Sequence, residues 1–110
     1  MNLQHVVEAL NCEVVCGDPS AVDVRQGLSC DLLSEVMAAA GKADLWITVQ
    51  SHSNIVAVSV IVGIKCILLA NGRDYNGDTI EKAKQEKIVL LKCNSGAFEL
   101  SGRIYEMFQR

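Results

Sequence analysis

Residues 45–70, LWITVQSHSNIVAVSVIVGIKCILLA, decide the fold class of this 110-residue chain. Residues 45–49 and 66–70 are nearly continuous apolar runs of strand length, which is typical of strands buried on both faces of a parallel sheet. Two parallel strands need a connection of about a dozen residues or more, and residues 51–65 have that length. We therefore predict a strand, a crossover helix and a second, parallel strand.

The crossover contains residues 55–62, whose β-branched side chains would on their own favour a strand. Its context favours a helix, because Ser53 or Asn54 can cap its start and Gly63 can end it. We therefore predict a buried helix over residues 55–62. The polar cluster before it then forms a turn between the strand and the helix.

Downstream of this unit the same alternation continues. Residues 88–91 predict a third buried strand, and Asp78 can cap a charged helix that ends at Lys87. Asn94 or Ser95 can cap a final helix, whose apolar stripe consists of Ala97, Leu100, Ser101, Ile104, Met107 and Phe108.

Upstream, residues 3–10 predict a helix that Asn2 caps and Asn11 ends, followed by a short strand at residues 13–16. Residues 22–27 predict a second extended segment, and a helix at 32–40 follows, capped by Asp31 and closed by Gly41. Together these patterns predict a small three-layer α/β sandwich, with a mainly parallel sheet and flanking helices, as one domain over residues 1–110.

Composition excludes several classes of protein. The net charge of -3 and the scattered basic residues argue against a nucleic-acid surface. The longest apolar run, residues 55–64, is too short to cross a bilayer, and the first residues lack the features of a signal peptide. Five cysteines do not fit a closed disulfide framework. We expect a cytoplasmic protein with reduced thiols and no membrane contact.

Two cysteines are close in sequence. If one strand covers both Cys12 and Cys16, their thiols lie on the same face. Their spacing differs from the C-x-x-C of zinc and redox sites, so we expect neither a metal nor a cofactor.

Polar side chains follow each of the three buried strands. In an open parallel sheet, ligands bind beyond the carboxyl ends of the strands, and the helices that start there favour anions. We predict a site for a small anionic ligand, nucleotide or phosphate-like, formed by Gln50, Ser51, His52, Asn54, Asn71, Gly72, Arg73, Asn94 and Ser95. The alternative is that these residues only cap helices and form turns.

Individual side chains suggest different chemistry. Arg73 could clamp a phosphate or carboxylate, and His52 could serve as an acid, a base, a ligand contact or a metal ligand. The chain lacks a phosphate loop, a dinucleotide fingerprint and a nucleophile elbow. We expect a non-catalytic domain. The alternative is a small acid/base enzyme that uses His52, with Ser51, Ser53 or Asn71 as helpers.

Three stretches carry a family resemblance: DLLSEVM (31–37), DLWITVQSHSNIVAVSV (44–60) and SGAFELSGRIYEM (95–107). Together they resemble a DRTGG domain over nearly the whole chain. The five-residue motif that names the family is absent, and Asn71-Gly72-Arg73 stands where a glycine-rich turn is expected.

The resemblance implies a fold similar to the N-terminal domain of HPr kinase/phosphorylase and a regulatory or assembly role, commonly as a homodimer. Such domains accompany CBS pairs in some inorganic pyrophosphatases. Stand-alone copies occur near iron-only hydrogenase genes, which implies a link to hydrogenase or anaerobic metabolism. A further alternative is a pure interaction module for a protein partner, which predicts an exposed apolar patch or a dimer groove.

Overall fold

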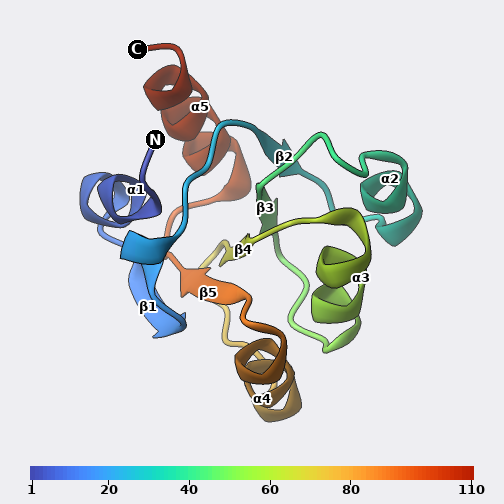
Figure 1. The fold of residues 1–110 in the computed structure, drawn as a ribbon. Coiled ribbons are helices and arrows are strands. Elements are labelled where there is room, and N and C mark those ends of the chain that lie inside the picture. The colour runs from blue at the N-terminus through green and yellow to red at the C-terminus, as the bar shows by residue number, and fades with distance from the viewer.

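The computed structural model describes all residues, 1–110, and contains one five-stranded sheet with the strand order β1-β5-β4-β3-β2. Neighbouring strands from β5 to β2 are parallel, whereas β1 is antiparallel to β5 at one edge (Figure 1). The predicted strand–helix–strand unit and the mainly parallel sheet are confirmed. The strands are β1 (Glu13–Cys16), β2 (Gly27–Ser29), β3 (Leu45–Thr48), β4 (Cys66–Leu69) and β5 (Val89–Lys92).

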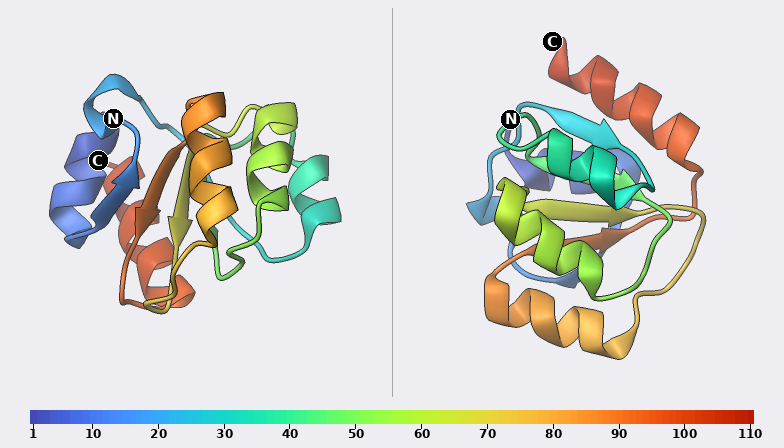
Figure 2. Two further views of the ribbon diagram at one scale, coloured as in Figure 1. Left: turned by 90° about the horizontal axis from the view of Figure 1, so that it is seen from below. Right: turned by 90° about the vertical axis from the view of Figure 1, so that its right-hand side faces the viewer.

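Helices cover both faces of the sheet and make the predicted three layers (Figure 2). One face carries α1 (Leu3–Leu10) and α5 (Ala97–Phe108). The other face carries α2 (Leu33–Ala38), α3 (Asn54–Val62) and α4 (Gly77–Glu86). A short 3-10 helix, Pro19–Ala21, lies between β1 and β2. None of these helices has both the length and the apolar character needed to cross a membrane.

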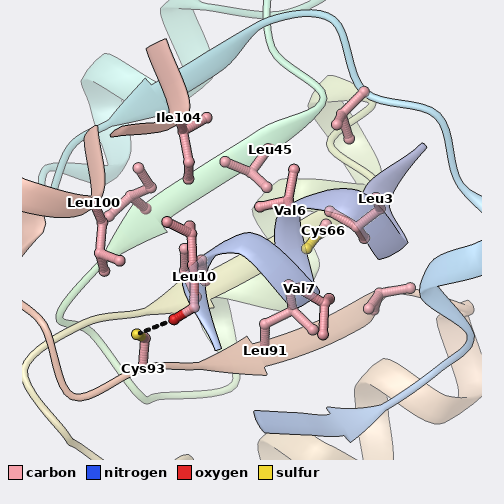
Figure 3. Close-up of a cluster of buried hydrophobic side chains, with 14 of the residues drawn as sticks. Leu3, Val6, Val7, Leu10, Leu45, Cys66, Leu91, Cys93, Leu100 and Ile104 are labelled. Atoms are coloured by element: carbon pink, nitrogen blue, oxygen red, sulfur yellow. Dashed lines mark hydrogen bonds between the residues drawn. The ribbon is translucent and has the colours of Figure 1, made fainter. Parts of the chain in front are cut away.

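The central strands are apolar throughout because both of their faces are buried. Leu45 and Ile47 of β3 pack under α1 and α5, whereas Trp46 packs on the opposite side. Figure 3 shows the first of these two layers, where Leu10 of α1 and Leu100 of α5 meet the sheet. Trp46 is 0% exposed, and its Nε1 donates a hydrogen bond of 2.7 Å to the Cys30 carbonyl.

The ambiguous segment is a helix, α3, as predicted. Its β-branched side chains are tolerated because Ile55, Val56 and Val62 are buried against the sheet, and tertiary packing outweighs helix propensity. Gly63 ends the helix with a φ of 88°, as expected. The cap prediction is confirmed for the position, because Ser53 is the N-cap residue, but its side chain makes no capping hydrogen bond. Instead the Asn54 N–H donates to His52 Nδ1, at 3.1 Å.

The predicted cap at Asp31 was wrong. Its carboxylate accepts hydrogen bonds from Thr48 Oγ1 at 2.8 Å and from the Val49 N–H at 2.9 Å. The parallel pairing of β2 with β3 brings these two donors next to Asp31, so the carboxylate joins two strand ends instead of starting a helix. The following helix, α2, is shorter than predicted and has no side-chain cap.

Two further caps differ from the prediction. Asp78 lies in the first turn of α4, because the extended residue before the helix is Asn76. Neither Asn94 nor Ser95 caps α5, whose N-cap residue is Gly96 and which has no side-chain cap bond.

The second extended segment lies later in the chain than predicted. Residues 22–27 were expected to be extended, but the paired strand is Gly27–Ser29. Before it, the chain runs along the N-terminal segment, where Asn2 and Asp23 form an isolated bridge. The first half of the predicted segment therefore pairs with the N-terminal residues and not with the sheet.

Cys12 and Cys16 do not share a face. The β1–β5 pairing changes register between Val14 and Cys16, which marks a β-bulge. One extra residue reverses the alternation of side chains along a strand. Consequently Cys12 packs beside the α1/α5 layer, whereas Cys16 is buried in the layer on the other side.

Candidate functional site

The loops after β3, β4 and β5 meet at one edge of the sheet, which we call the carboxyl edge. Hydrogen bonds join them directly. The Asn71 N–H donates to the Ser95 carbonyl and the Gly72 N–H to the Cys93 carbonyl, both at 2.9 Å. Arg73 Nη1 lies 3.5 Å from the Val49 carbonyl oxygen, which links the β4 loop to the β3 loop. The three predicted polar stretches are therefore neighbours in space.

Ser51 ties the β3 loop to the start of α4. Its carbonyl accepts hydrogen bonds from Thr79 Oγ1 at 2.7 Å and from the Asn76 N–H at 3.2 Å. Its hydroxyl also donates to Asn76 Oδ1, at 3.4 Å. These contacts give Ser51 a structural role in holding the edge together. Thr79 and Asn76, which the sequence did not single out, complete this junction.

Asn71 and Gly72 form a tight turn. Both have positive φ angles, 65° and 66°, and the Arg73 N–H closes the turn on the Ala70 carbonyl at 3.5 Å. Asn-Gly is the residue pair that turns with two positive φ angles prefer. A Cβ atom on Gly72 would lie 3.1 Å from Asn94 Oδ1, so this glycine also permits the close approach of the next loop. Turn chemistry explains both residues.

The three helices that begin at this edge start differently. His52 Nδ1 accepts the Asn54 N–H at the start of α3, whereas α4 and α5 have no side-chain cap. The first N–H groups of an α-helix have no partner within the helix and carry the positive end of its dipole. The starts of α4 and α5 therefore offer N–H donors that no capping side chain occupies.

Arg73 is exposed at the carboxyl edge, and its positive charge forms no salt bridge. The other nearby cation, Lys92, pairs with Asp74 and lies 3.9 Å from Glu13 Oε2. The hydrogen bond to Asp74 raises the pKa of Lys92, which keeps this amine charged. Because Lys92 is engaged, Arg73 is the side chain best placed to attract an anion.

His52 is exposed, and its Nδ1 accepts the Asn54 N–H. It has no hydrogen bond to a carboxylate or to a backbone carbonyl. A general acid or base oriented for catalysis normally has such a partner in a closed pocket. In this structure His52 therefore accepts the Asn54 N–H at the start of α3, and it lacks the partner and the enclosed pocket that a general acid or base needs.

The side-chain oxygen Oε1 of Gln50 is buried and has no hydrogen-bond partner. It is the one buried side-chain oxygen or nitrogen atom in the chain of which this is true. Its backbone N–H is satisfied by Thr48 Oγ1 at 3.2 Å. A buried acceptor without a donor lowers stability, typically by about 1–3 kcal/mol, so such an atom in a native fold calls for an explanation. Because the atom is buried, a bound molecule could donate to it only after the Gln50 side chain has turned outward.

Asp31 belongs to the carboxyl edge and was missed as a site residue. From the sequence, the extended segment was predicted at residues 22–27. With the strand placed that early, no strand end directly precedes Asp31. A strand placed at Gly27–Ser29 would have predicted that Asp31 lies beside the other loops, as it does. Nowhere in the chain do three or more His, Cys, Asp or Glu residues gather as a metal site would require.

A cavity of about 380 Å³ lies between α5 and the β2 side of the sheet, and it begins at the carboxyl edge, where Phe98 stands in the first turn of α5. We call it the α5 groove; its lining includes Leu28, Phe98, Gly102, Tyr105 and Phe108. Phe98 is 94% exposed and Tyr105 66% exposed. Because these aromatic residues are seven positions apart, two helical turns, they lie on one face of α5 outside its buried stripe.

Comparison with known proteins places the fold. No family model and no curated protein sequence matches the chain. A solved structure matches with a TM-score of 0.72 and 14% sequence identity over 92% of this chain. It contains the CBS and DRTGG domains of the regulatory region of Clostridium perfringens pyrophosphatase, in complex with the activator diadenosine tetraphosphate. The chain spans 44% of that structure's length and has a DRTGG-like fold, which confirms the fold predicted from the resemblance.

Proposed function

We propose that this chain is a non-catalytic regulatory domain that binds a small anionic ligand at the carboxyl edge. The observation that carries the proposal is the joining of three loops: the hydrogen bonds of Asn71 and Gly72 tie the β4 loop to the β5 loop, and Arg73 ties it to the β3 loop. Their arrangement puts Arg73 and the uncapped starts of α4 and α5 at the same edge. A guanidinium group and free helix N–H groups are together the donors that phosphate and carboxylate groups prefer.

The buried, unsatisfied Gln50 Oε1 would take part in binding if its side chain turns outward when the ligand arrives. It is an acceptor, so it pairs with a donor, whereas Arg73 and the helix starts pair with negative charge. A nucleotide offers both kinds of group, through its phosphates and through its ribose hydroxyls or base amine. The structural neighbour supports this class, because that regulatory region is complexed with diadenosine tetraphosphate.

Titration calorimetry with a panel of anions tests the proposal. The panel contains diadenosine tetraphosphate, ATP, AMP, inorganic phosphate and citrate. We expect one nucleotide to bind and Arg73→Ala to weaken its binding roughly tenfold or more, since a charge-assisted hydrogen bond contributes about 1.5–3 kcal/mol. Arg110→Ala is the matched control, because it removes the same charge from an exposed pair with Glu106 at the far end of α5.

Two outcomes contradict the proposal. One is that no member of the panel releases or takes up heat beyond dilution. The other is binding that Arg73→Ala and Arg110→Ala reduce equally, because that result would reflect net charge and not a site at the carboxyl edge.

A second candidate function, self-association, is favoured by the α5 groove. Phe98 and Tyr105 expose aromatic surface beside a cavity, and neighbouring exposed aromatic residues of this kind favour contact with another protein surface. We propose that a second copy of the chain covers this groove, which corresponds to the homodimer that the resemblance implies. The link to hydrogenase or anaerobic metabolism remains a prediction from the resemblance.

Sedimentation equilibrium measures this association. Phe98→Ser is expected to shift the mass toward the monomer. Ile61→Ser is the control, because Ile61 is a comparably exposed apolar residue on α3, on the opposite face of the sheet. A monomeric wild-type chain, or equal effects of the two substitutions, would refute self-association at the groove.

A further inference from the structure

We propose that Cys12 and Cys93 form a redox-active thiol pair that closes reversibly to a disulfide between the two ends of the chain. The register of the β1–β5 ladder places them together. Glu13 pairs with Lys92 and Val14 with Leu91 in antiparallel fashion. Cys12 precedes Glu13 and Cys93 follows Lys92, so continuing the same register sets the two cysteines directly opposite each other.

The backbone hydrogen bonds identify the type of pair. The Cys12 N–H donates to the Val7 carbonyl at 3.0 Å, and the Cys93 N–H donates to the Leu69 carbonyl of β4 at 2.9 Å. Neither N–H group points across the β1–β5 gap, so the cysteines occupy a non-hydrogen-bonded position. Opposed Cα atoms at such positions are about 4.5 Å apart, which lies within the roughly 4.4–6.8 Å that disulfides span.

The side chains also point the same way. Both cysteines contact the α1/α5 layer, and the Cys93 thiol donates to the Leu10 carbonyl at 3.6 Å (Figure 3). Burial, together with the charge of Cys93 and a hydrogen bond to its side chain, raises the pKa of Cys12 to about 12, and Arg103 opposes this shift. The effect of Cys93 on this pKa agrees with the neighbouring positions that the strand register gives the two cysteines.

Exposure determines the order of steps. Cys12 is partly exposed, whereas Cys93 is buried, so a small disulfide such as oxidised glutathione meets Cys12 first. The Cys12 thiolate attacks it, which forms a protein–glutathione disulfide and releases one glutathione thiolate. The Cys93 thiolate then displaces the second glutathione thiolate and forms the protein disulfide. Overall, two protein thiols are oxidised and one glutathione disulfide is reduced to two thiols. The high pKa of Cys12 makes the first step slow at neutral pH.

Peptide mapping of the native protein tests this pair. The folded chain is incubated with oxidised glutathione at roughly pH 8.5, where the thiolate population is larger, then alkylated, digested and analysed by mass spectrometry. We expect two of the five thiols to disappear, a peptide pair linked through Cys12 and Cys93, and a melting temperature raised by roughly 10 °C or more, because the bond closes a long loop. Dithiothreitol should reverse all three changes.

Variants supply the controls. Cys30→Ser keeps the linked peptide, since Cys30 lies on the other side of the sheet. Cys12→Ser and Cys93→Ser abolish it, and the wild-type map decides the question even if one variant fails to fold. The proposal is overturned if the thiols remain reduced, if Cys12 stops at the glutathione adduct, or if the linked peptides involve other cysteines.

Discussion

Replacing Tyr75 with phenylalanine gives a stability difference whose sign depends on pH. Tyr75 is 7% exposed, and its hydroxyl contacts the carbonyl oxygens of Leu91 at 2.6 Å and Ile67 at 3.1 Å, on two neighbouring strands. The hydroxyl has one proton, which it donates to the closer of the two oxygens, that of Leu91. The substitution keeps the buried ring and removes the hydroxyl, so at neutral pH we expect the free energy of unfolding to fall by about 1 kcal/mol.

The sign changes above pH 10. Burial, reinforced by the neighbouring Cys66, raises the pKa of Tyr75 from its ordinary value of 10.0. Below pH 10 the hydroxyl is protonated in both folded and unfolded chains, so its contribution is fully present. Above pH 10 the unfolded chain ionises while the folded chain does not, and the contribution falls by up to about 1.4 kcal/mol per pH unit. The phenylalanine variant has no such loss, so it should become the more stable protein within about one pH unit above 10.

Urea denaturation measured between roughly pH 7 and 11.5 follows this crossing. Trp46 is the single tryptophan and is buried, so its fluorescence reports unfolding. Burial also raises the pKa of Cys12, Cys16 and Cys66, so both proteins lose stability in alkali and only their difference is diagnostic. A difference that stays constant across the whole pH range would refute the reasoning.

Three other substitutions have expected effects that urea denaturation can measure. Gly17→Ala should destabilise the chain by more than about 1 kcal/mol, because Gly17 has a φ of 90° and a Cβ would lie 3.0 Å from the Val89 Cα; unchanged stability would contradict this. Lys87→Gly should stabilise it by up to about 1 kcal/mol, since Lys87 ends α4 with a φ of 59°, and a loss would argue against that conformation. Asp31→Ala should cost roughly 2 kcal/mol or more, because the Thr48 hydroxyl and the Val49 N–H lose a charged acceptor; a cost near zero would mean that water replaces it.

The fold was predictable because its central strands are buried on both sides. Residues 45–49, 66–70 and 88–91 can only be so uniformly apolar if helices cover both faces, and that requirement fixes the layers. The position of β2 could not be predicted in this way. The strand is three residues long and mostly exposed, so its sequence has little hydrophobic pattern. Helix caps were poorly predicted for a different reason. A side chain such as Asp31 bonds to whichever donors tertiary structure brings closest, and sequence separation does not reveal them.

The candidate site was predicted in part. Parallel strands bring their following loops to one edge, so the proximity of Asn71, Gly72 and Ser95 follows from the strand pattern alone. The hydrogen bonds of His52 and Ser51 could not be predicted from the strand pattern, because they depend on local turn geometry and on contacts between loops. The place of the α5 groove was not predicted, since the groove lies between α5 and the short strand β2, whose position the sequence did not reveal.

The antiparallel strand at the sheet's edge has a consequence for how the chain assembles. β1 lies near the beginning of the sequence and pairs only with β5, which lies near its end. During synthesis on a ribosome, residues 13–16 therefore emerge long before their partner exists. The parallel unit from β2 to β4 can form first. β1 can dock only after β5 has been synthesised. Because contacts between residues far apart in sequence form slowly, we expect the docking of β1 on β5 to be a late step of folding.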